Sequence, residues 1–375
     1  MKKTFAPRPG FTLVELLVST AIISLLMLVL VSMTNQTSDV WQKTTEKVEK
    51  FEEARDAFES MTRQISQATL NTYWDYLDKN NKPRDTNVQS TAYKQFVPIY
   101  YGRTSELRFI SGPMSSYLMN SAGSAPQPTH GIFFAAPLGN TSTAAYEQLD
   151  NLLNIYGYYV EIGTEDSRPP FITSSITPMR WRSRLKEFRQ PTEGMDLYDM
   201  AIPDPVTGIA TNLWYAPTLS TSSRVLADNV IALIILPKLS KEDSDARGTS
   251  AAPLCPVYEY DSTKTANPGN TVGDPAINPH NQLPPIVQVT MVAIDEKSAR
   301  RFLDTQGPGA TPKYFGVDTA GTPSYFVQSS ATLETPSTGD LAKYEQALVK
   351  AGMTYRIFSM NVSIRGAKWS RSQTN

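Results

Sequence analysis

One stretch near the start of the chain, from Phe11 to Met33, limits what the rest can be, because it is predominantly apolar and holds a single charged side chain, Glu15. A helix of about 20 apolar residues spans the roughly 30 Å hydrocarbon layer of a membrane. The polar leader before it carries Lys2, Lys3 and Arg8. Positive charges favour the cytoplasmic side for their flank, so we predict a single-pass membrane helix with a cytoplasmic N-terminus.

Glu15 distinguishes this stretch from two ordinary membrane signals. A cleaved signal peptide has a shorter apolar core that ends in an Ala-x-Ala-like site, and residues 32–35 offer no such site. A plain signal anchor accounts for the length and the flanking charges, yet a carboxylate inside the membrane costs roughly 2.5–3.5 kcal/mol on insertion scales. We therefore expect the carboxylate to have a cationic partner.

The segment Gly10-Phe11-Thr12-Leu13-Val14-Glu15, directly before a spanning helix, resembles the class III signal sequence of type IV pilins and type II secretion pseudopilins. The resemblance implies that a prepilin peptidase cleaves between Gly10 and Phe11 and methylates the new N-terminus at Phe11. It also implies that Glu15 pairs with the N-terminal amine of a neighbouring subunit when the retained helices assemble. A plain signal anchor is the alternative.

The same resemblance implies partners and a location. The partners are a prepilin peptidase/methyltransferase, other pilin or pseudopilin subunits, and the lipid of the inner membrane. The N-terminus is expected in the cytoplasm and the head in the periplasm, or on the cell surface within a filament. No nucleic acid is expected as a partner, because 35 basic and 36 acidic residues leave a net charge of −1 and no basic footprint.

Helical periodicity continues beyond the membrane stretch. Apolar or small residues recur three, four or seven positions apart, which is the spacing of an amphipathic helix. They are Val40, Thr44, Val48, Phe51, Phe58, Met61, Ile65 and Ala68. No Pro or Gly interrupts the chain up to about Trp74, which predicts a spine helix of about 60 residues, or roughly 90 Å. A membrane helix followed by a coiled-coil stalk is the alternative. The predicted parts are a leader (1–10), a membrane and assembly half of the helix (11–33), its amphipathic half (34–76) and an extracytoplasmic head (77–375).

The head is predicted to be rich in antiparallel strands, so the fold class is α+β, with a long spine helix packed on a β-sheet-rich domain. The predicted strands are 106–111, 131–137, 155–162, 180–190, 224–237, 284–295 and 354–365, and the predicted short helices are 297–303 and 340–351.

Four segments of the head carry more specific expectations. The continuous apolar run at 224–237 indicates a central strand covered on both faces. The alternating charges of 180–190 favour a strand with a charged outer face over a site for single-stranded nucleic acid. Residues 240–285 and 306–339, rich in Pro, Gly, Ser and Thr, predict surface or partly disordered loop insertions. Tyr73, Trp74 and Tyr76 are expected in the core, whereas an exposed cluster there would indicate a binding face.

Two wider resemblances rest on later segments. Leu226–Val230, Leu283–Val289 and a closing strand that ends at Ile364-Arg365 resemble the J-type and W-type minor pseudopilins. Ile65–Tyr76, Leu226–Leu239 and Val289–Glu296 resemble the Verru_Chthon cassette protein C family, prepilin-like proteins of Verrucomicrobia. Both resemblances imply a pilin-like role and neither implies a known activity.

No motif for catalysis, for a cofactor or for a metal is present, since the sequence lacks a phosphate loop, metal-ligand spacing and a nucleophile elbow. The loop carboxylates Asp243, Asp245, Asp261 and Asp274 match no calcium loop and are expected to be solvated.

The predicted function is a minor, non-enzymatic pilin or pseudopilin subunit, whose large head suggests a tip or low-copy position. The alternatives are a membrane-anchored extracytoplasmic binding protein that never polymerises, and a tethered enzyme.

Overall fold

The computed structural model describes residues 12–80, 82–85, 87–114, 118, 129–164, 181–195, 197, 214–248, 251–304, 325–327, 329–330, 333 and 335–370, without the side chains of 39, 42–50, 303 and 304. Gly10, Phe11 and most of the 306–339 segment lie outside the described residues. The chain divides into two compact units, Met1–Glu52 and Glu53–Asn375, here called the N-terminal and C-terminal units.

The helices are α1 (Leu13–Ile65), α2 (Thr91–Lys94), α3 (Lys241–Arg247), α4 (Glu296–Asp304) and α5 (Asp340–Lys350). The strands are β1 (Tyr73–Leu77), β2 (Tyr100–Thr104), β3 (Ile110–Pro113), β4 (His130–Pro137), β5 (Leu153–Thr164), β6 (Trp181–Gln190), β7 (Ser223–Asp228), β8 (Val230–Lys238), β9 (Tyr260–Asp261), β10 (Ile286–Ile294) and β11 (Tyr355–Ser363).

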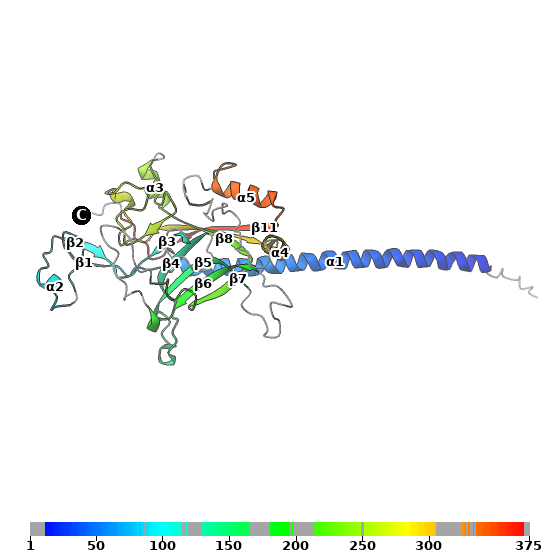
Figure 1. The fold of residues 1–375 in the computed structure, drawn as a ribbon, viewed down its shortest axis with the longest axis horizontal. Helices are drawn as coiled ribbons and strands as arrows, with labels where there is room; N and C mark the ends of the chain where they lie inside the picture. Colours follow the sequence, from blue (N-terminus) through cyan, green and yellow to red (C-terminus); the bar gives the residue numbers. More distant parts are fainter. Residues whose placement is uncertain are drawn as a thin grey trace, which may run out of the picture. The chain divides into compact units, whose positions relative to one another are not determined.

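Three sheets form among the described residues, and every strand pair in them is antiparallel. The largest has the order β7-β6-β5-β4-β3-β9, the second β11-β10-β8, and the smallest is the hairpin-like pair β1-β2 (Figure 1). A long N-terminal helix followed by antiparallel sheets and a few short helices confirms the α+β class.

The spine helix α1 is shorter than predicted, because it ends at Ile65 and does not run to residue 76. Beyond that point Thr69 forms a bridge to Ala135 of β4, its N–H donating to the Ala135 carbonyl at 2.8 Å. Asn71 then takes a left-handed backbone conformation with φ of 45°, which a helix cannot continue through. The aromatic residues that follow build β1, as expected from their preference for strands.

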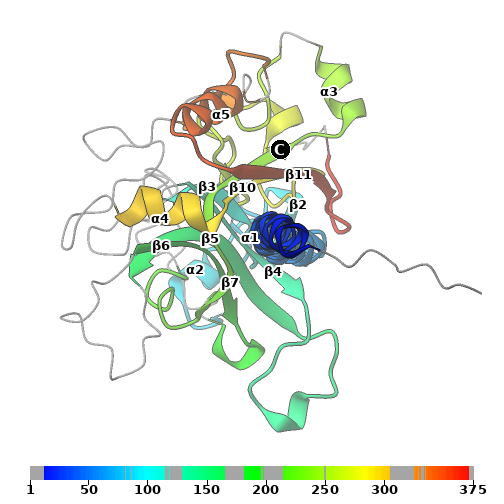
Figure 2. The same cartoon turned by 90° about the vertical axis from the view of Figure 1, so that its right-hand side faces the viewer.

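The part of α1 in the C-terminal unit packs on both larger sheets through one stripe. Ala54, Phe58, Met61 and Ile65 are buried, and their spacing of four, three and four residues is the predicted amphipathic pattern. The Phe58 ring lies 5.8 Å from that of Phe358 in β11. Figure 2 shows this end of α1 between the three-stranded sheet and the six-stranded one.

On the opposite sheet, Tyr158 of β5 donates a hydrogen bond to Gln64 of α1. The C-terminal part of α1 is therefore held by a ring contact to one sheet and by a hydrogen bond to the other.

The apolar run 224–237 is not one strand, which corrects the prediction. Asn229, with φ of 59°, separates β7 from β8, and the two strands belong to different sheets. β8 also ends its sheet and does not lie at its centre. β8 can be buried because residues beside its free edge accept hydrogen bonds from its N–H groups. Leu233 N–H donates to Thr129 Oγ1 at 3.0 Å, and Ile235 N–H donates to His130 Nδ1 at 3.1 Å.

The segment 240–285 was expected to be a surface or partly disordered excursion, but it supplies part of the core. It contributes β9 to the six-stranded sheet, and Cys255 and Tyr260 are fully buried. Asp261 forms a buried ion pair with Arg108, in which Nε donates to Oδ1 at 3.0 Å and Nη2 to Oδ2 at 2.5 Å. Low hydrophobicity misled the prediction, because polar side chains anchor this segment.

Strand β6 forms as predicted, but its charges do not lie on an exposed outer face. Arg182 pairs with Glu296 of α4 at 2.7 Å. Lys186 pairs with Glu161 of β5, and the fully buried Glu187 pairs with Arg224 of β7. A buried charge is tolerated only when it is paired, and neighbouring elements supply the partner in each case.

Candidate functional site

Thr12 and Glu15 close the N-terminal end of α1. Glu15 Oε2 accepts hydrogen bonds from the backbone N–H and the hydroxyl of Thr12, both at 3.0 Å, and Glu15 N–H donates to Thr12 Oγ1 at 3.3 Å. This reciprocal pattern is a capping box, which satisfies N–H groups that the first turn leaves free. The sequence reasoning identified Glu15 but missed Thr12, although Thr-x-x-Glu before an apolar run is the sequence signature of such a cap.

The side chain of Glu15 keeps bonding capacity after capping the helix. Both hydrogen bonds reach Oε2, and no described residue bonds Oε1. The side chain is fully exposed within the N-terminal unit. A cationic partner from outside the described residues thus has an open oxygen to bind.

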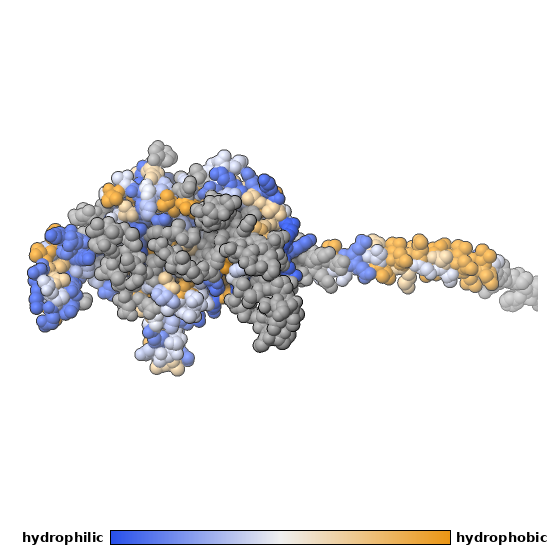
Figure 3. All heavy atoms as spheres, in the orientation of Figure 1, coloured by the Kyte–Doolittle hydropathy of each residue, from blue (hydrophilic) through white to orange (hydrophobic). Residues whose placement is uncertain are grey.

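The helix surface that follows is apolar and uncovered. Leu13–Ser38 is long and apolar enough to cross a membrane, and none of its most apolar window is buried. Its 26 residues amount to about 39 Å of helix at 1.5 Å per residue, more than the roughly 30 Å hydrocarbon layer requires. Figure 3 shows this part of α1 as predominantly hydrophobic.

Three hydroxyl groups of this segment illustrate bonding within their own helix. Thr20 Oγ1 donates to the Leu16 carbonyl at 3.0 Å, Ser24 Oγ to the Thr20 carbonyl at 2.7 Å, and Thr34 Oγ1 to the Leu30 carbonyl at 2.8 Å. In lipid, every polar group must find a partner within the protein. These three hydroxyls meet that condition without a second helix, whereas Oε1 of Glu15 has no partner among the described residues.

The loop carboxylates in the C-terminal unit do not form a metal site. No group of three or more potential ligands occurs among the described residues. Asp243 accepts the Ser240 hydroxyl at α3, and Asp274 accepts a hydrogen bond from Arg247 at 3.0 Å. Burial raises the pKa of Asp261, but the charge and hydrogen bonds of Arg108 outweigh that effect and lower the pKa below its ordinary value. The prediction of solvated carboxylates is wrong for Asp261, which has a structural role.

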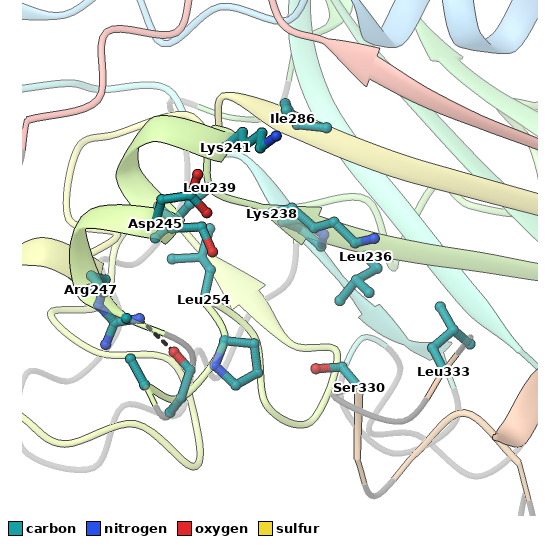
Figure 4. Close-up of a pocket in the computed structure, with 16 residues that line it drawn as sticks. Leu236, Lys238, Leu239, Lys241, Asp245, Arg247, Leu254, Ile286, Ser330 and Leu333 are labelled. Atoms are coloured by element: carbon teal, nitrogen blue, oxygen red, sulfur yellow. Dashed lines mark hydrogen bonds between the residues drawn. The ribbon is translucent and has the colours of Figure 1, made fainter. Parts of the chain in front are cut away.

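A hollow of about 520 Å³ lies between the end of β8 and α3 (Figure 4). Arg247 Nη1 donates to the Ala252 carbonyl at 2.5 Å, and the Ser330 hydroxyl donates to the Cys255 carbonyl. These polar groups hold the 240–285 segment in place. The described lining contains neither His nor Cys.

The aromatic residues of β1 are exposed, contrary to the expectation of a core position. Tyr73, Trp74 and Tyr76 all lie on the surface of the C-terminal unit. The β1–β2 pair forms a sheet of its own, so one of its faces is left without a covering layer.

One family model matches the chain. The model of the prokaryotic N-terminal methylation motif matches residues 7–31, which include Gly10, Phe11 and Glu15. No curated protein and no solved structure matches the chain. The chain therefore carries a prepilin-type methylation signal that leads into an exposed apolar helix, as type IV pilin-like proteins and pseudopilins do.

Proposed function

We propose that this protein is a minor pilin or pseudopilin, a structural subunit of a filament of the type IV pilus or type II secretion kind. A prepilin peptidase cleaves between Gly10 and Phe11 and methylates the amine of Phe11. The processed helix then leaves the membrane laterally into a growing filament. The observation that carries the proposal is the methylation motif at residues 7–31, joined to an apolar helix whose most apolar window is not buried by any of the described residues.

Glu15 recruits the incoming subunit in this mechanism. A carboxylate in lipid is costly unless it is paired, and the methylated amine of a neighbouring Phe11 is a cation at the same depth. Thr12 holds one carboxylate oxygen at the helix end and leaves the other free. The cap thus pre-orients the acid, which reduces the entropy lost when the pair forms.

The C-terminal unit is exposed on the outer side of the inner membrane, either in the periplasm or on the cell surface. Its size suggests a tip or low-copy position, because a bulky head clashes least where no subunit is stacked above it. The spine helix packed on antiparallel sheets and the closing strands β10 and β11 are consistent with a J-type or W-type pseudopilin, the finer identity that we propose.

The intact mass of the membrane-extracted protein, produced with and without a prepilin peptidase, tests the processing step. We expect loss of residues 1–10 and gain of one methyl group only when the peptidase is present. A Gly10→Ile variant is the matched control and should stay uncleaved. An unchanged mass of the unaltered protein in both hosts would refute the proposal.

A second candidate function is a membrane-anchored binding protein that does not polymerise. The capping box favours it, because the cap gives Glu15 a role that needs no neighbour. The two functions differ in a Glu15→Gln variant, whose amide oxygen can still accept from Thr12 but carries no charge. Loss of cross-linking to other subunits would support assembly, whereas an unaltered pattern would support the tether.

A further inference from the structure

The β1–β2 pair presents three aromatic rings on one uncovered face. Trp74 pairs with Arg103, and Tyr76 pairs with Tyr101. Side chains alternate between the faces of a strand, so these four residues share a face. Trp74, Tyr76 and Tyr101 are 57%, 59% and 56% exposed. Tyr and Trp at this exposure on adjacent strands are unusual for a face that binds nothing.

The three rings form one continuous surface, here called the aromatic platform. The rings of Trp74 and Tyr101 lie 5.7 Å apart and within 23° of parallel, and those of Tyr76 and Tyr101 lie 5.3 Å apart with their planes tilted by 58°. On the other face of the pair, Leu77 and Thr104 are buried. The pair is therefore anchored from behind, and its rings are held ready for a ligand.

A hollow of about 810 Å³ lies beside the start of β2. Ile99 is exposed, lies two residues before Tyr101 and lines the hollow. The hollow is also lined by Lys79, Lys82 and Arg84, and it is here called the basic hollow. Figure 3 shows apolar atoms beside strongly hydrophilic ones at the end of the molecule that holds β1 and β2.

Lys79, Lys82 and Arg84 line the hollow with two carboxylates, Asp78 and Asp85, so three positive charges against two negative ones leave one net positive charge. Asp78 accepts hydrogen bonds from backbone N–H groups of the turn, including that of Lys82 at 3.0 Å. Asp85 accepts the Ser90 hydroxyl at 2.6 Å and a backbone N–H. The ammonium groups of Lys79 and Lys82 have no ion-pair or hydrogen-bond partner among the described residues. A negatively charged group would complement them.

We infer that the aromatic platform and the basic hollow together bind an acidic polysaccharide, a chain of uronic acid units. The apolar C–H face of a sugar ring fits against an exposed aromatic ring and removes both surfaces from water. The carboxylate of a neighbouring sugar reaches Lys79 or Lys82. An acidic polysaccharide supplies both sugar rings and carboxylates along one chain, so it can contact the rings and the lysines together. This binding goes beyond the structural role proposed above and does not depend on it.

The test uses the detergent-solubilised full chain and three probes: polygalacturonate, an uncharged glucan of similar length, and polyglutamate of similar charge. Binding to each immobilised probe is measured at two salt concentrations. Trp74→Ala and Tyr101→Ala remove the ring contacts, and a paired Lys79→Gln and Lys82→Gln variant removes the charge. The matched controls are Tyr146→Ala, which alters an exposed ring elsewhere, and Lys350→Gln, which removes an exposed charge on α5.

We expect polygalacturonate to bind, and each ring variant and the lysine pair to weaken it by about tenfold or more, the usual loss for a central contact. The two controls should bind as the unaltered protein does, and higher salt should weaken binding. Binding of the glucan with equal affinity would overturn the role of charge. Equal binding of polyglutamate would overturn the role of the rings and point to an acidic peptide. Circular dichroism and thermal unfolding check that the variants are folded. Absence of polygalacturonate binding by the unaltered protein would overturn the proposal outright.

Discussion

Replacing the buried Asp261 by Asn should destabilise the protein more than the same replacement at Asp243, Asp245 or Asp274. Asp261 lies in the 240–285 segment and binds Arg108 through two hydrogen bonds, at 3.0 and 2.5 Å. The side chains of the pair are only 1% and 5% exposed. The amide of Asn keeps the shape and one acceptor, but it removes the negative charge with which the buried guanidinium pairs.

The expected loss is about 3–5 kcal/mol in the free energy of unfolding, the range for removing one partner of a buried ion pair. The matched control is Asp228→Asn. That carboxylate is 55% exposed and lies 3.5 Å from Arg184, so its loss should change stability by about 0–1 kcal/mol. Arg108→Met combined with Asp261→Leu should recover most of the loss, since apolar replacements of a buried pair are often neutral.

Guanidinium unfolding of the detergent-solubilised chain, followed by tryptophan fluorescence, measures the three variants. Trp214 lies 5.8 Å from the Arg108 guanidinium and reports on this part of the core. If Asp261→Asn were within about 1 kcal/mol of Asp228→Asn, the pair would not be structurally important. The conclusion that this segment belongs to the core would then fail.

Three further predictions concern the core and the helix end. Burial lowers the pKa of His130 from 6.5 to about 4, so as the pH falls through that range the unfolded state takes up a proton before the folded state does. The free energy of unfolding should fall by up to about 1.4 kcal/mol per pH unit. In His130→Gln this dependence on pH should be weaker by the same amount. Equal dependence in the two proteins would contradict the prediction. A Cβ on Gly157 would lie 2.2 Å from the Phe133 ring, so Gly157→Ala should cost about 1–3 kcal/mol. Gly163→Ala on the same strand, whose nearest contact is 3.7 Å, is its control in a thermal unfolding assay, where equal midpoints would refute the packing argument. Thr12→Val removes the cap and should destabilise the helix end by about 0.5–2 kcal/mol. Amide hydrogen exchange in the first turn should then be faster. Unchanged exchange would exclude the capping role.

The parts of the protein that were predictable from sequence are those whose signals are local. The methylation motif and the apolar helix each lie within one short stretch, and the motif match at residues 7–31 confirms that reading. Strands β4, β10 and β11 and helices α4 and α5 were predictable because each carries its own periodicity. The role of Glu15 in assembly is still a prediction, since the described residues show only its bonds to Thr12.

Tertiary structure decided which elements pair and which charges are buried. Residues 224–237 are mostly apolar, and a left-handed Asn229 divides them between two sheets. Glu187 is polar by any scale and is fully buried, because Arg224 and Tyr158 reach it.

By itself the sequence determined the apolar helix, the methylation signal and the α+β class, because helix formation, apolar length and short motifs depend on neighbours along the chain. Only the tertiary structure decided that Tyr76 lies on an open face and that Asp261 lies in the core. The partner of Asp261 is 153 residues away, and the free energy of burying a charge depends on that partner and not on the residues beside it.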